Sequence, residues 1–350
     1  MNDDSRAAAA FPLELRDIDR RIWEEEIAPV LPWRIFDIHT HAYRREYVGP
    51  GSQNLGYPIF SVVFPNVGWR ELDAADALML PGREVHRIAF GFPFQDVDFD
   101  AINRFVIAES RNDPASGAFL LVNPGMSPES VEESILREGF LGLKPYRLYS
   151  TGDPHESRIT EFLPEPLIAV ADRYGLPITL QLSMRRSVSH PDNIADLERL
   201  SERYPHVKWI MAHCARAFYP QTLDRVGDRI AQLRNVYFDS TAVCDYGSYD
   251  ALLLWVGPKR ILYGSDDLPA CADRGKYISW GEAWIHFNED MMEKRGKPDH
   301  CDPSMTFIRY EVLRALCRAI RRHGLGREDV EAIFHDTAAA LVAEAGSAVW

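Results

Sequence analysis

Residues 34–43 read RIFDIHTHAY, a short apolar run that ends in two histidines, His39 and His41. Side chains of a strand alternate between its two faces, so residues two apart point to the same side. A single histidine in such a run is usually a packing residue, but two imidazoles on one face can bind the same metal ion. The stretch therefore predicts a strand that carries part of a metal site, with a packing role as the alternative.

The apolar character of this stretch recurs along the chain. Amphipathic segments with helical spacing, such as PESVEESILREG, separate most of the seven further runs, which lie at 85–92, 117–124, 139–146, 176–183, 207–213, 235–241 and 260–266. Eight strands that alternate with helices predict an α/β fold, a (β/α)8 TIM barrel over about residues 34–340. An open doubly wound sheet is the alternative, but the Gly-rich turn expected after its first strand is absent.

Three segments flank or interrupt this pattern. Residues 13–29 predict a helix within an N-terminal extension (1–33), and the tail from residue 304 predicts extra C-terminal helices. The long loop after strand 1, residues 42–82, is expected on the face where barrel enzymes keep their sites, as a lid or a wall of the site. No repeat or linker divides the chain, so we expect a single domain over residues 1–350.

Composition excludes several classes of partner. The net charge of −13 argues against nucleic acid, because phosphate binding needs a basic face. No apolar run approaches the length of a membrane span, and the acidic start lacks the apolar segment of a secretory signal. The five cysteines are odd in number and contain no Cys-x-x-Cys pair. We therefore expect a cytoplasmic protein without a membrane partner, and an assembly of identical chains stays open.

Polar residues stand at the ends of several predicted strands. Catalytic residues of barrels come from the carboxyl ends of the strands, so these residues form one candidate site. The later strands carry Lys144, Gln181, His213, Asp239 and Asp266. Imidazoles and a carboxylate from different strands can make a nitrogen and oxygen shell for a metal ion. A lysine inside an apolar strand is costly unless it is used, which favours a functional over a structural Lys144.

Four motifs in sequence carry a family resemblance: DIHTH (37–41), GLKPYR (142–147), IMAHCAR (210–216) and ILYGSDD (261–267). Their order and spacing resemble the amidohydrolase superfamily of metal-dependent TIM-barrel hydrolases, in the branch that includes decarboxylases and lactonases. The resemblance extends over nearly the whole chain. It implies a metal-dependent enzyme.

The resemblance also implies roles for individual residues. His39 and His41 would bind a divalent ion, commonly Zn²⁺, with Fe²⁺ or Mn²⁺ as alternatives and one or two ions per chain. Asp266 would bind the ion or serve as the general base. His213 would bind a second ion or act as an acid or base nearby, and Lys144 would bridge two ions if it is carboxylated.

One position departs from the family pattern. Strand five of the family usually ends in a histidine, whereas this chain has Gln181 there. Its amide oxygen is a candidate metal ligand, although a weaker one for zinc than imidazole. His155 and His190, in neighbouring loops, could compensate, but most loop histidines are simply exposed.

Arginines and aromatic residues follow the predicted strand ends. Arg binds carboxylates and phosphates in a bidentate fashion, so Arg147, Arg185 and Arg216 are candidate substrate-binding residues, together with Tyr146 and Tyr43. The combination favours a small anionic substrate with an apolar or aromatic body. Ordinary solvated arginines paired with the many acidic residues are the alternative.

The sequence thus predicts a hydrolase that cleaves an amide, ester, lactone or thioester bond with a metal-activated water. In this prediction Asp266, His213 and Lys144 are the catalytic residues. A non-oxidative decarboxylase of an aromatic or unsaturated acid fits the same residues and is the main alternative. A barrel that has lost catalysis is a third interpretation, which Gln181 favours and the intact histidines oppose.

Overall fold

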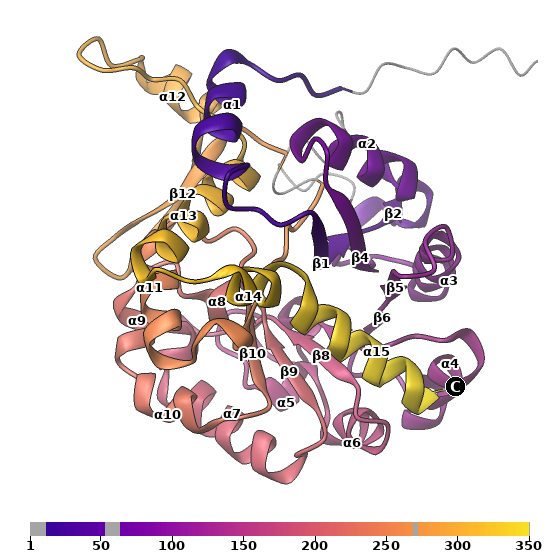
Figure 1. The fold of residues 1–350 in the computed structure, drawn as a ribbon. Coiled ribbons are helices and arrows are strands. Elements are labelled where there is room, and N and C mark those ends of the chain that lie inside the picture. Colours follow the sequence, from indigo (N-terminus) through magenta and orange to yellow (C-terminus); the bar gives the residue numbers. More distant parts are fainter. Residues whose placement is uncertain (1–11, 53–63, 269–271, 350) are drawn as a thin grey trace, which may run out of the picture.

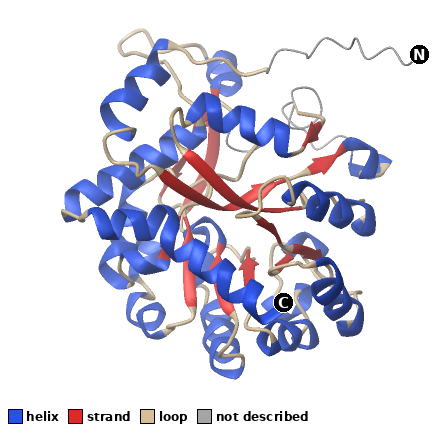
Figure 2. Cartoon of the chain, turned by 45° about the vertical axis from the view of Figure 1, so that its right-hand side comes forward, coloured by secondary structure: helices blue, strands red, loops and turns tan. Residues whose placement is uncertain are grey.

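The computed structural model describes residues 12–52, 64–268 and 272–349 (Figure 1). Strands lie in the interior of the molecule, and helices surround them (Figure 2). Within the described residues, no helix combines the length and the apolar composition that a membrane span requires.

Two parallel sheets contain the predicted strands. The larger sheet has six strands in the order β11-β10-β9-β8-β7-β6. These are β6 (Leu120–Val122), β7 (Leu143–Pro145), β8 (Pro177–Leu180), β9 (Lys208–Met211), β10 (Val236–Asp239) and β11 (Ile261–Leu262). The smaller sheet has the order β1-β4-β5, with β1 (Arg34–His41), β4 (Glu84–Phe90) and β5 (Gly117–Ala118). Each of the eight predicted runs therefore contains a strand, and the α/β prediction is confirmed.

Backbone hydrogen bonds connect the two sheets at both edges. Only Phe119 separates β5 from β6, and its N–H donates to the carbonyl of Ala89 at 3.0 Å. At the other edge, the N–H of Ile38 in β1 donates to the carbonyl of Tyr263 at 3.0 Å, just after β11. The N–H of His41 donates to the carbonyl of Asp267 at 2.8 Å. The first and last strands thus lie side by side.

Helices follow most of the strands. Helix α4 shows how the sequence defines them: Ser127 caps it by accepting from the N–H of Ser130, Pro128 begins it, and Gly139 ends it at φ 90°. The helices after the strands are α2 (Trp69–Met79), α3 (Phe99–Ser110), α4 (Pro128–Glu138), α5 (Ile159–Phe162), α6 (Glu165–Arg173), α7 (Pro191–Arg203), α8 (Ala212–Arg216), α9 (Gln221–Asp224), α10 (Gly227–Gln232) and α11 (Tyr246–Trp255). Short 3₁₀ turns are η2 (Arg45–Tyr47), η3 (Pro50–Ser52), η5 (Arg147–Tyr149), η6 (Ser187–Ser189) and η7 (Pro258–Arg260).

The N-terminal segment and the C-terminal tail both form helices, as predicted. The N-terminal segment forms α1 (Asp17–Ile22), which continues into a π-helical turn, η1 (Trp23–Ile27). The tail forms α12 (Glu289–Arg295), α13 (Ile308–His323), α14 (Arg327–Glu331), a π-helical turn η8 (Ala332–Asp336) and α15 (Thr337–Val349).

Two expectations need correction. The segment 42–82 is not all loop, because it contains the short strands β2 (Tyr43–Arg44) and β3 (Asn66–Val67) and the helix α2. Its residues 53–63 lie outside the described part of the chain. The prediction also missed an antiparallel hairpin before α13, formed by β12 (Gly275–Trp280) and β13 (Ala283–Asn288). Its two strands, joined by a short turn, lie outside the alternation of strands and helices from which the fold was predicted.

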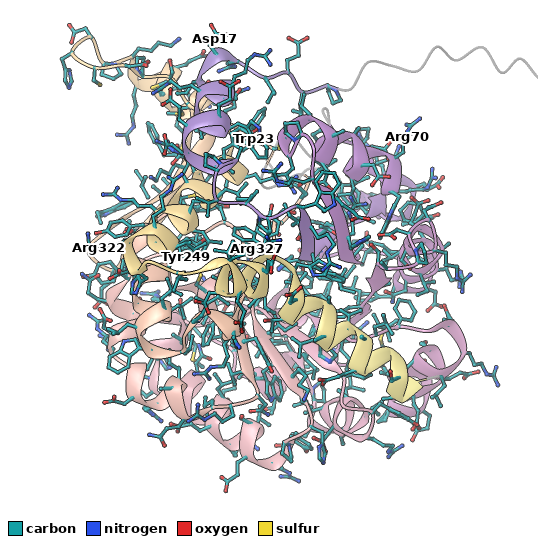
Figure 3. The ribbon with its side chains drawn as sticks, viewed as in Figure 1. Asp17, Trp23, Arg70, Tyr249, Arg322 and Arg327 are labelled. Carbon is teal, nitrogen blue, oxygen red and sulfur yellow. The ribbon has the colours of Figure 1, made fainter. Side chains whose placement is uncertain are left out.

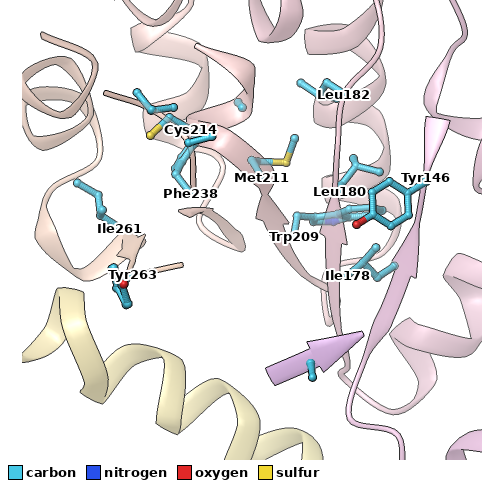
Figure 4. Close-up of a cluster of buried hydrophobic side chains, with 14 of the residues drawn as sticks. Tyr146, Ile178, Leu180, Leu182, Trp209, Met211, Cys214, Phe238, Ile261 and Tyr263 are labelled. Carbon is cyan, nitrogen blue, oxygen red and sulfur yellow. The ribbon is translucent and has the colours of Figure 1, made fainter. Parts of the chain in front are cut away.

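The interior of the larger sheet is apolar. Side chains of neighbouring strands pack together there, among them Ile178 and Leu180 of β8 and Trp209 and Met211 of β9, all fully buried (Figure 4). Burial of such side chains supplies about 1.5–3 kcal/mol each. The apolar core positions the strand ends that carry the polar residues.

A charged cluster is buried between β1, α2 and α13. The guanidinium of Arg309, 0% exposed, lies 2.6 Å from an Asp267 carboxylate oxygen and 2.7 Å from one of Asp76. Its Nε also donates to the hydroxyl of Tyr263 at 2.8 Å. The same guanidinium is 3.9 Å from Asp37 of β1. One arginine of the C-terminal helix thus neutralises carboxylates from three separate segments.

Replacing Arg309 tests this cluster. We expect Arg309→Met to lower the free energy of unfolding by about 3–5 kcal/mol, because it leaves buried carboxylates without their cation. Urea denaturation of the purified variant measures the loss. The matched control is Arg322→Met on the same helix, at the position labelled in Figure 3. The Arg322 side chain is 66% exposed, so this substitution should change stability by less than about 0.5 kcal/mol. Equal effects of the two substitutions would contradict the importance of the cluster.

Candidate metal centre

Three side chains meet where β1 and the segment after β11 end. His39, His41 and Asp266 are all buried, and one donor atom of each lies within 4.8 Å of the others. An Asp266 carboxylate oxygen is 3.1 Å from Nε2 of His41 and 3.3 Å from Nε2 of His39. The N–H of Asp266 donates to the carbonyl of His39 at 2.9 Å, which fixes the two segments against each other. We call these three residues the triad.

The tautomer of His39 leaves a lone pair facing the triad. Its Nδ1 lies 2.8 Å from a carboxylate oxygen of Asp239 on β10, which can only accept, so Nδ1 carries the proton. Nε2 then points its lone pair toward the Asp266 oxygen. Nδ1 of His41 is buried and has no hydrogen-bond partner among the described residues. The lone pair of His39, a ring nitrogen of His41 and the Asp266 carboxylate surround one point, an arrangement that fits a divalent cation. The Asp239 carboxylate bound to the far nitrogen of His39 is typical of metal-bound histidines.

The charges of the triad support each other. Burial opposes ionisation of Asp266, but its close contacts with the ring nitrogens of His39 and His41 hold its pKa well below the usual value. Burial likewise opposes ionisation of Asp239, yet the charge and hydrogen bond of His39 lower its pKa to about 2. Both carboxylates are therefore anionic at neutral pH.

Lys144 of β7 reaches the same centre. Its side chain is 0% exposed, and Nζ lies 3.4 Å from Nε2 of His39. The ammonium also lies 4.3 Å from the ring centre of Phe90 and 4.8 Å from that of Tyr146. Burial lowers the pKa of Lys144 to about 7, although the two nearby carboxylates oppose this shift. The amine is thus a positive or readily deprotonated group beside the triad.

His213 lies beside the triad but not on a strand. Strand β9 ends at Met211, and His213 begins a left-handed turn in which residues 213–216 all have φ between 50° and 60°. Such a conformation costs about 1–2 kcal/mol per residue. Hydrogen bonds from the N–H of His213 to Asp239 at 2.8 Å and to the Thr241 hydroxyl at 3.2 Å hold the turn. The centres of the His213 and His39 rings are 5.7 Å apart.

The side chain of His213 is held at both nitrogens. Nδ1 lies 2.8 Å from the Thr241 hydroxyl and 3.2 Å from the Thr241 carbonyl. The amide nitrogen of Gln181 lies 3.2 Å from Nε2. Burial lowers the pKa of His213 to about 4, so the ring is neutral at pH 7. Asp239 stands among the predicted strand-end residues without a predicted role, and Thr241 is not among them. Their spacing of two residues, which places both side chains on one face of a strand, was the available signal.

The other candidate site residues lie in different surroundings. Tyr146 is buried beside Lys144, and its hydroxyl has no hydrogen-bond partner in the described part of the chain. Arg147 and Arg216 are partly buried near the strand ends. Arg185 is 91% exposed and pairs with Glu156 at 3.3 Å, away from the triad. Tyr43 is fully buried, and its hydroxyl donates to the carbonyl of Phe64 at 2.7 Å, so it packs under the segment after β1.

The loop histidines do not join the metal donors. His155 is exposed, and its Nδ1 lies 3.2 Å from the guanidinium of Arg147. His190 caps α7, where Nδ1 accepts from the N–H of Asp192. His286 lies on β13 and stacks on Tyr277. None of the three is among the metal-donor groups of the described residues.

Solved structures share this fold. A Burkholderia multivorans amidohydrolase with bound zinc matches with a TM-score of 0.57 and 14% identity, over 88% of this chain and 99% of that one. The 4-oxalomesaconate hydratase of Rhodopseudomonas palustris matches with a TM-score of 0.55 and 15% identity, over 89% and 96% of the chains. A 2,6-dihydroxybenzoate decarboxylase in complex with 2,6-dihydroxybenzoate matches with a TM-score of 0.51 and 13% identity, over 89% and 99%.

Sequence comparison gives the family. The chain matches no curated protein. The amidohydrolase family model matches residues 36–343, nearly the whole chain and all of the strands described above. The chain therefore belongs to the amidohydrolase family and is an enzyme of the amidohydrolase superfamily.

Proposed function

We propose that this protein is a metal-dependent hydrolase built on a closed (β/α)8 barrel, with its site at the carboxyl ends of the strands. The hydrogen bonds between β1 and the segment after β11, and the continuity of β5 with β6, support closure. We further propose that about residues 34–340 form one domain that acts on a small anionic molecule and takes neither nucleic acid nor a membrane as partner. The single observation that carries the proposal is the triad.

The triad would hold the metal ion. His39 and His41 supply neutral nitrogens, and Asp266 supplies an anionic oxygen, a donor set that suits Zn²⁺ and also Fe²⁺ or Mn²⁺. One ion on the triad is the simplest occupancy; a second would have to use His213, Lys144 and the amide oxygen of Gln181. A bound divalent ion supplies Lewis acidity, which polarises a carbonyl group and makes water more acidic.

The residues around the triad would share the proton transfers. The Asp266 carboxylate, kept anionic by its two histidines, would accept a proton from the attacking water and deliver it to the leaving group. The Lys144 amine, buried against aromatic rings, would place positive charge where an oxyanion develops. His213 would offer Nε2 to the substrate, since Thr241 keeps the ring proton on Nδ1.

A non-oxidative decarboxylase is the second candidate. Aromatic rings surround His41, with ring centres of Phe92 and Phe90 at 4.9 and 5.0 Å and that of Tyr146 at 6.4 Å. Such surroundings suit an aromatic or unsaturated acid. In this reaction the same residues would bind the acid, and a protonated group beside the triad would deliver a proton to the carbon that loses CO₂.

Metal analysis tests the triad. We expect purified, unchelated protein to contain at least one divalent ion per chain, and His39→Ala/His41→Ala to bind it more than about 100-fold more weakly, since two of three donors are gone. Inductively coupled plasma mass spectrometry after dialysis measures the content. His155→Ala/His300→Ala removes two exposed histidines and should leave it unchanged. A metal-free wild type would overturn the proposal.

A substrate panel separates the two reactions. We expect metal-loaded protein to release acid from esters, lactones, amides or thioesters of small aromatic acids, and Asp266→Asn to lower that rate about 10²–10⁴-fold. A pH indicator follows acid release, and trapped CO₂ follows decarboxylation of the free acids. Release of CO₂ without acid release from any ester or lactone would contradict the hydrolase and favour the decarboxylase.

A pair of matched threonines tests how His213 is held. Thr241→Val removes the hydroxyl that lies 2.8 Å from His213 Nδ1, so we expect the free energy of unfolding to fall by about 1–3 kcal/mol. Thr179→Val is the control: that hydroxyl is buried without a partner among the described residues, so its loss should be neutral or stabilising. Urea denaturation measures both, and equal losses would count against the proposed role of Thr241.

A further inference from the structure

Two arginines near the proposed site form no ion pair with a carboxylate of the described residues. Arg147 begins η5 directly after Tyr146, and Arg216 ends the left-handed turn that begins at His213. Among the described residues, no carboxylate lies within 4.0 Å of either guanidinium, although the chain has an excess of 13 acidic over basic residues. Arg185, two residues after Ser183 in a neighbouring loop, shows the ordinary alternative, since it is exposed and paired with Glu156.

Backbone carbonyls hold both guanidiniums in place. Arg216 donates to the carbonyl of Leu182 at 2.9 Å and, more weakly, to that of Met184 at 3.5 Å. Arg147 donates to the carbonyl of Pro154 at 2.9 Å, while its Nε is buried with no partner in the described ranges. Each arginine therefore has a fixed orientation and unused N–H donors.

The electrostatics indicate a missing anion. Burial and, to a smaller extent, the charge of Arg147 lower the pKa of Arg216 to about 10, so the two guanidiniums repel each other. Burial also lowers the pKa of Arg147, and the charge of Asp153 opposes this shift. Holding two partly buried cations together without an anion costs free energy, which a bound oxyanion would offset by charge-assisted, bidentate hydrogen bonds.

Contacts connect this pair to the triad. In a left-handed turn, as in its mirror image, residues three apart lie on one face, which brings Arg216 beside His213. The ring of Phe218 stacks on His213 with a centroid distance of 6.0 Å and on Trp284 with 4.2 Å, and the Arg216 guanidinium lies 6.0 Å from the Trp284 ring centre. On the other side, Arg147 directly follows Tyr146 in the chain, and the Tyr146 ring centre lies 4.8 Å from Nζ of Lys144.

We propose that Arg147 and Arg216 bind a carboxylate of the substrate, separate from the bond that reacts at the triad, and that Phe218 and Trp284 contact a planar, unsaturated substrate body. The substrate class is then a flat molecule with a free carboxylate at one end and an ester, lactone, amide or second carboxyl group at the other. This inference rests on the proposed function, because it assigns the substrate of the same site.

Titration calorimetry with isophthalate, a flat dicarboxylate, tests the pair on metal-loaded protein. We expect Arg147→Gln and Arg216→Gln each to weaken binding about 10–100-fold, and Arg216→Lys to weaken it less, because it keeps the charge and loses the fork. Arg185→Gln is the matched control and should bind like wild type. Circular dichroism melts confirm that each variant is folded.

Other probes separate the possible failures. Uncharged isophthalamide should bind at least about 10-fold more weakly than isophthalate. Equal binding of the two, an equal effect of Arg185→Gln, no binding of isophthalate, or a preference for inorganic phosphate would each overturn the carboxylate assignment. In the His39→Ala/His41→Ala variant, residual isophthalate binding that still depends on Arg147 and Arg216 would support the pair even if the metal proposal fails.

Discussion

The geometry of the proposed centre depends on the buried guanidinium of Arg309. It binds Asp267, the residue after the proposed metal donor Asp266, and lies 3.9 Å from Asp37, two residues before His39. One oxygen of Asp37 accepts the N–H groups of His39 at 3.1 Å and Ser265 at 2.9 Å. The carboxylate thus ties the backbone of β1 to that of the segment after β11. Burial raises the pKa of Asp37 to about 6 and that of Asp267 to about 7, and the charge of Arg309 opposes both shifts. Because Arg309 comes from α13, a distant part of the chain stabilises these buried carboxylates and holds the two segments in register.

Strained backbone conformations also help to position the side chains of the proposed centre. Residues 213–216 take a left-handed conformation without a single glycine, and Asp266 has φ 64°. Strain of this kind persists only where surrounding contacts determine the conformation. Here Asp239 provides those contacts: one oxygen accepts from the N–H of His213, and the other from the ring of His39. One buried carboxylate therefore fixes the ring of His39 on β1 and the backbone of His213 in the turn after β9, so the two imidazoles need not both lie on regular strand positions.

Much of the fold could be predicted from the sequence, because alternating apolar runs and amphipathic segments depend on local periodicity. The hairpin of β12 and β13 could not be predicted in this way, because among the described residues its strands pair only with each other and they follow the last of the alternating apolar runs. At the site, His39, His41 and Asp266 stand at strand ends where the pattern places them. The surroundings of His213 depend on a left-handed turn, and those of Arg185 on a neighbouring acid, Glu156. Neither the turn nor the neighbouring acid can be predicted from the spacing of residues, so the sequence predicts the same substrate-binding role for Arg185 and Arg216.

The contrast between those arginines shows how charge is distributed in an acidic protein. With 52 acidic and 39 basic residues, most arginines have a carboxylate within reach, as Arg185 and Arg309 do. Arg147 and Arg216 are not the only arginines of the described residues that lack one: Arg260, for example, is held by the carbonyls of Ile230, Ala231 and Leu233. Arg147 and Arg216 differ from it in their position just after the ends of β7 and β9, close in sequence to Lys144 and His213. Dipoles and charges that are already fixed in place can stabilise a reacting group without moving first. They do so only where counter-ions have not already neutralised them. Lys144 lies beside the anionic Asp239 and Asp266, whereas Arg147 and Arg216 have no carboxylate within 4.0 Å among the described residues. In the proposed function these cations would attract an incoming anion although the chain as a whole is negative.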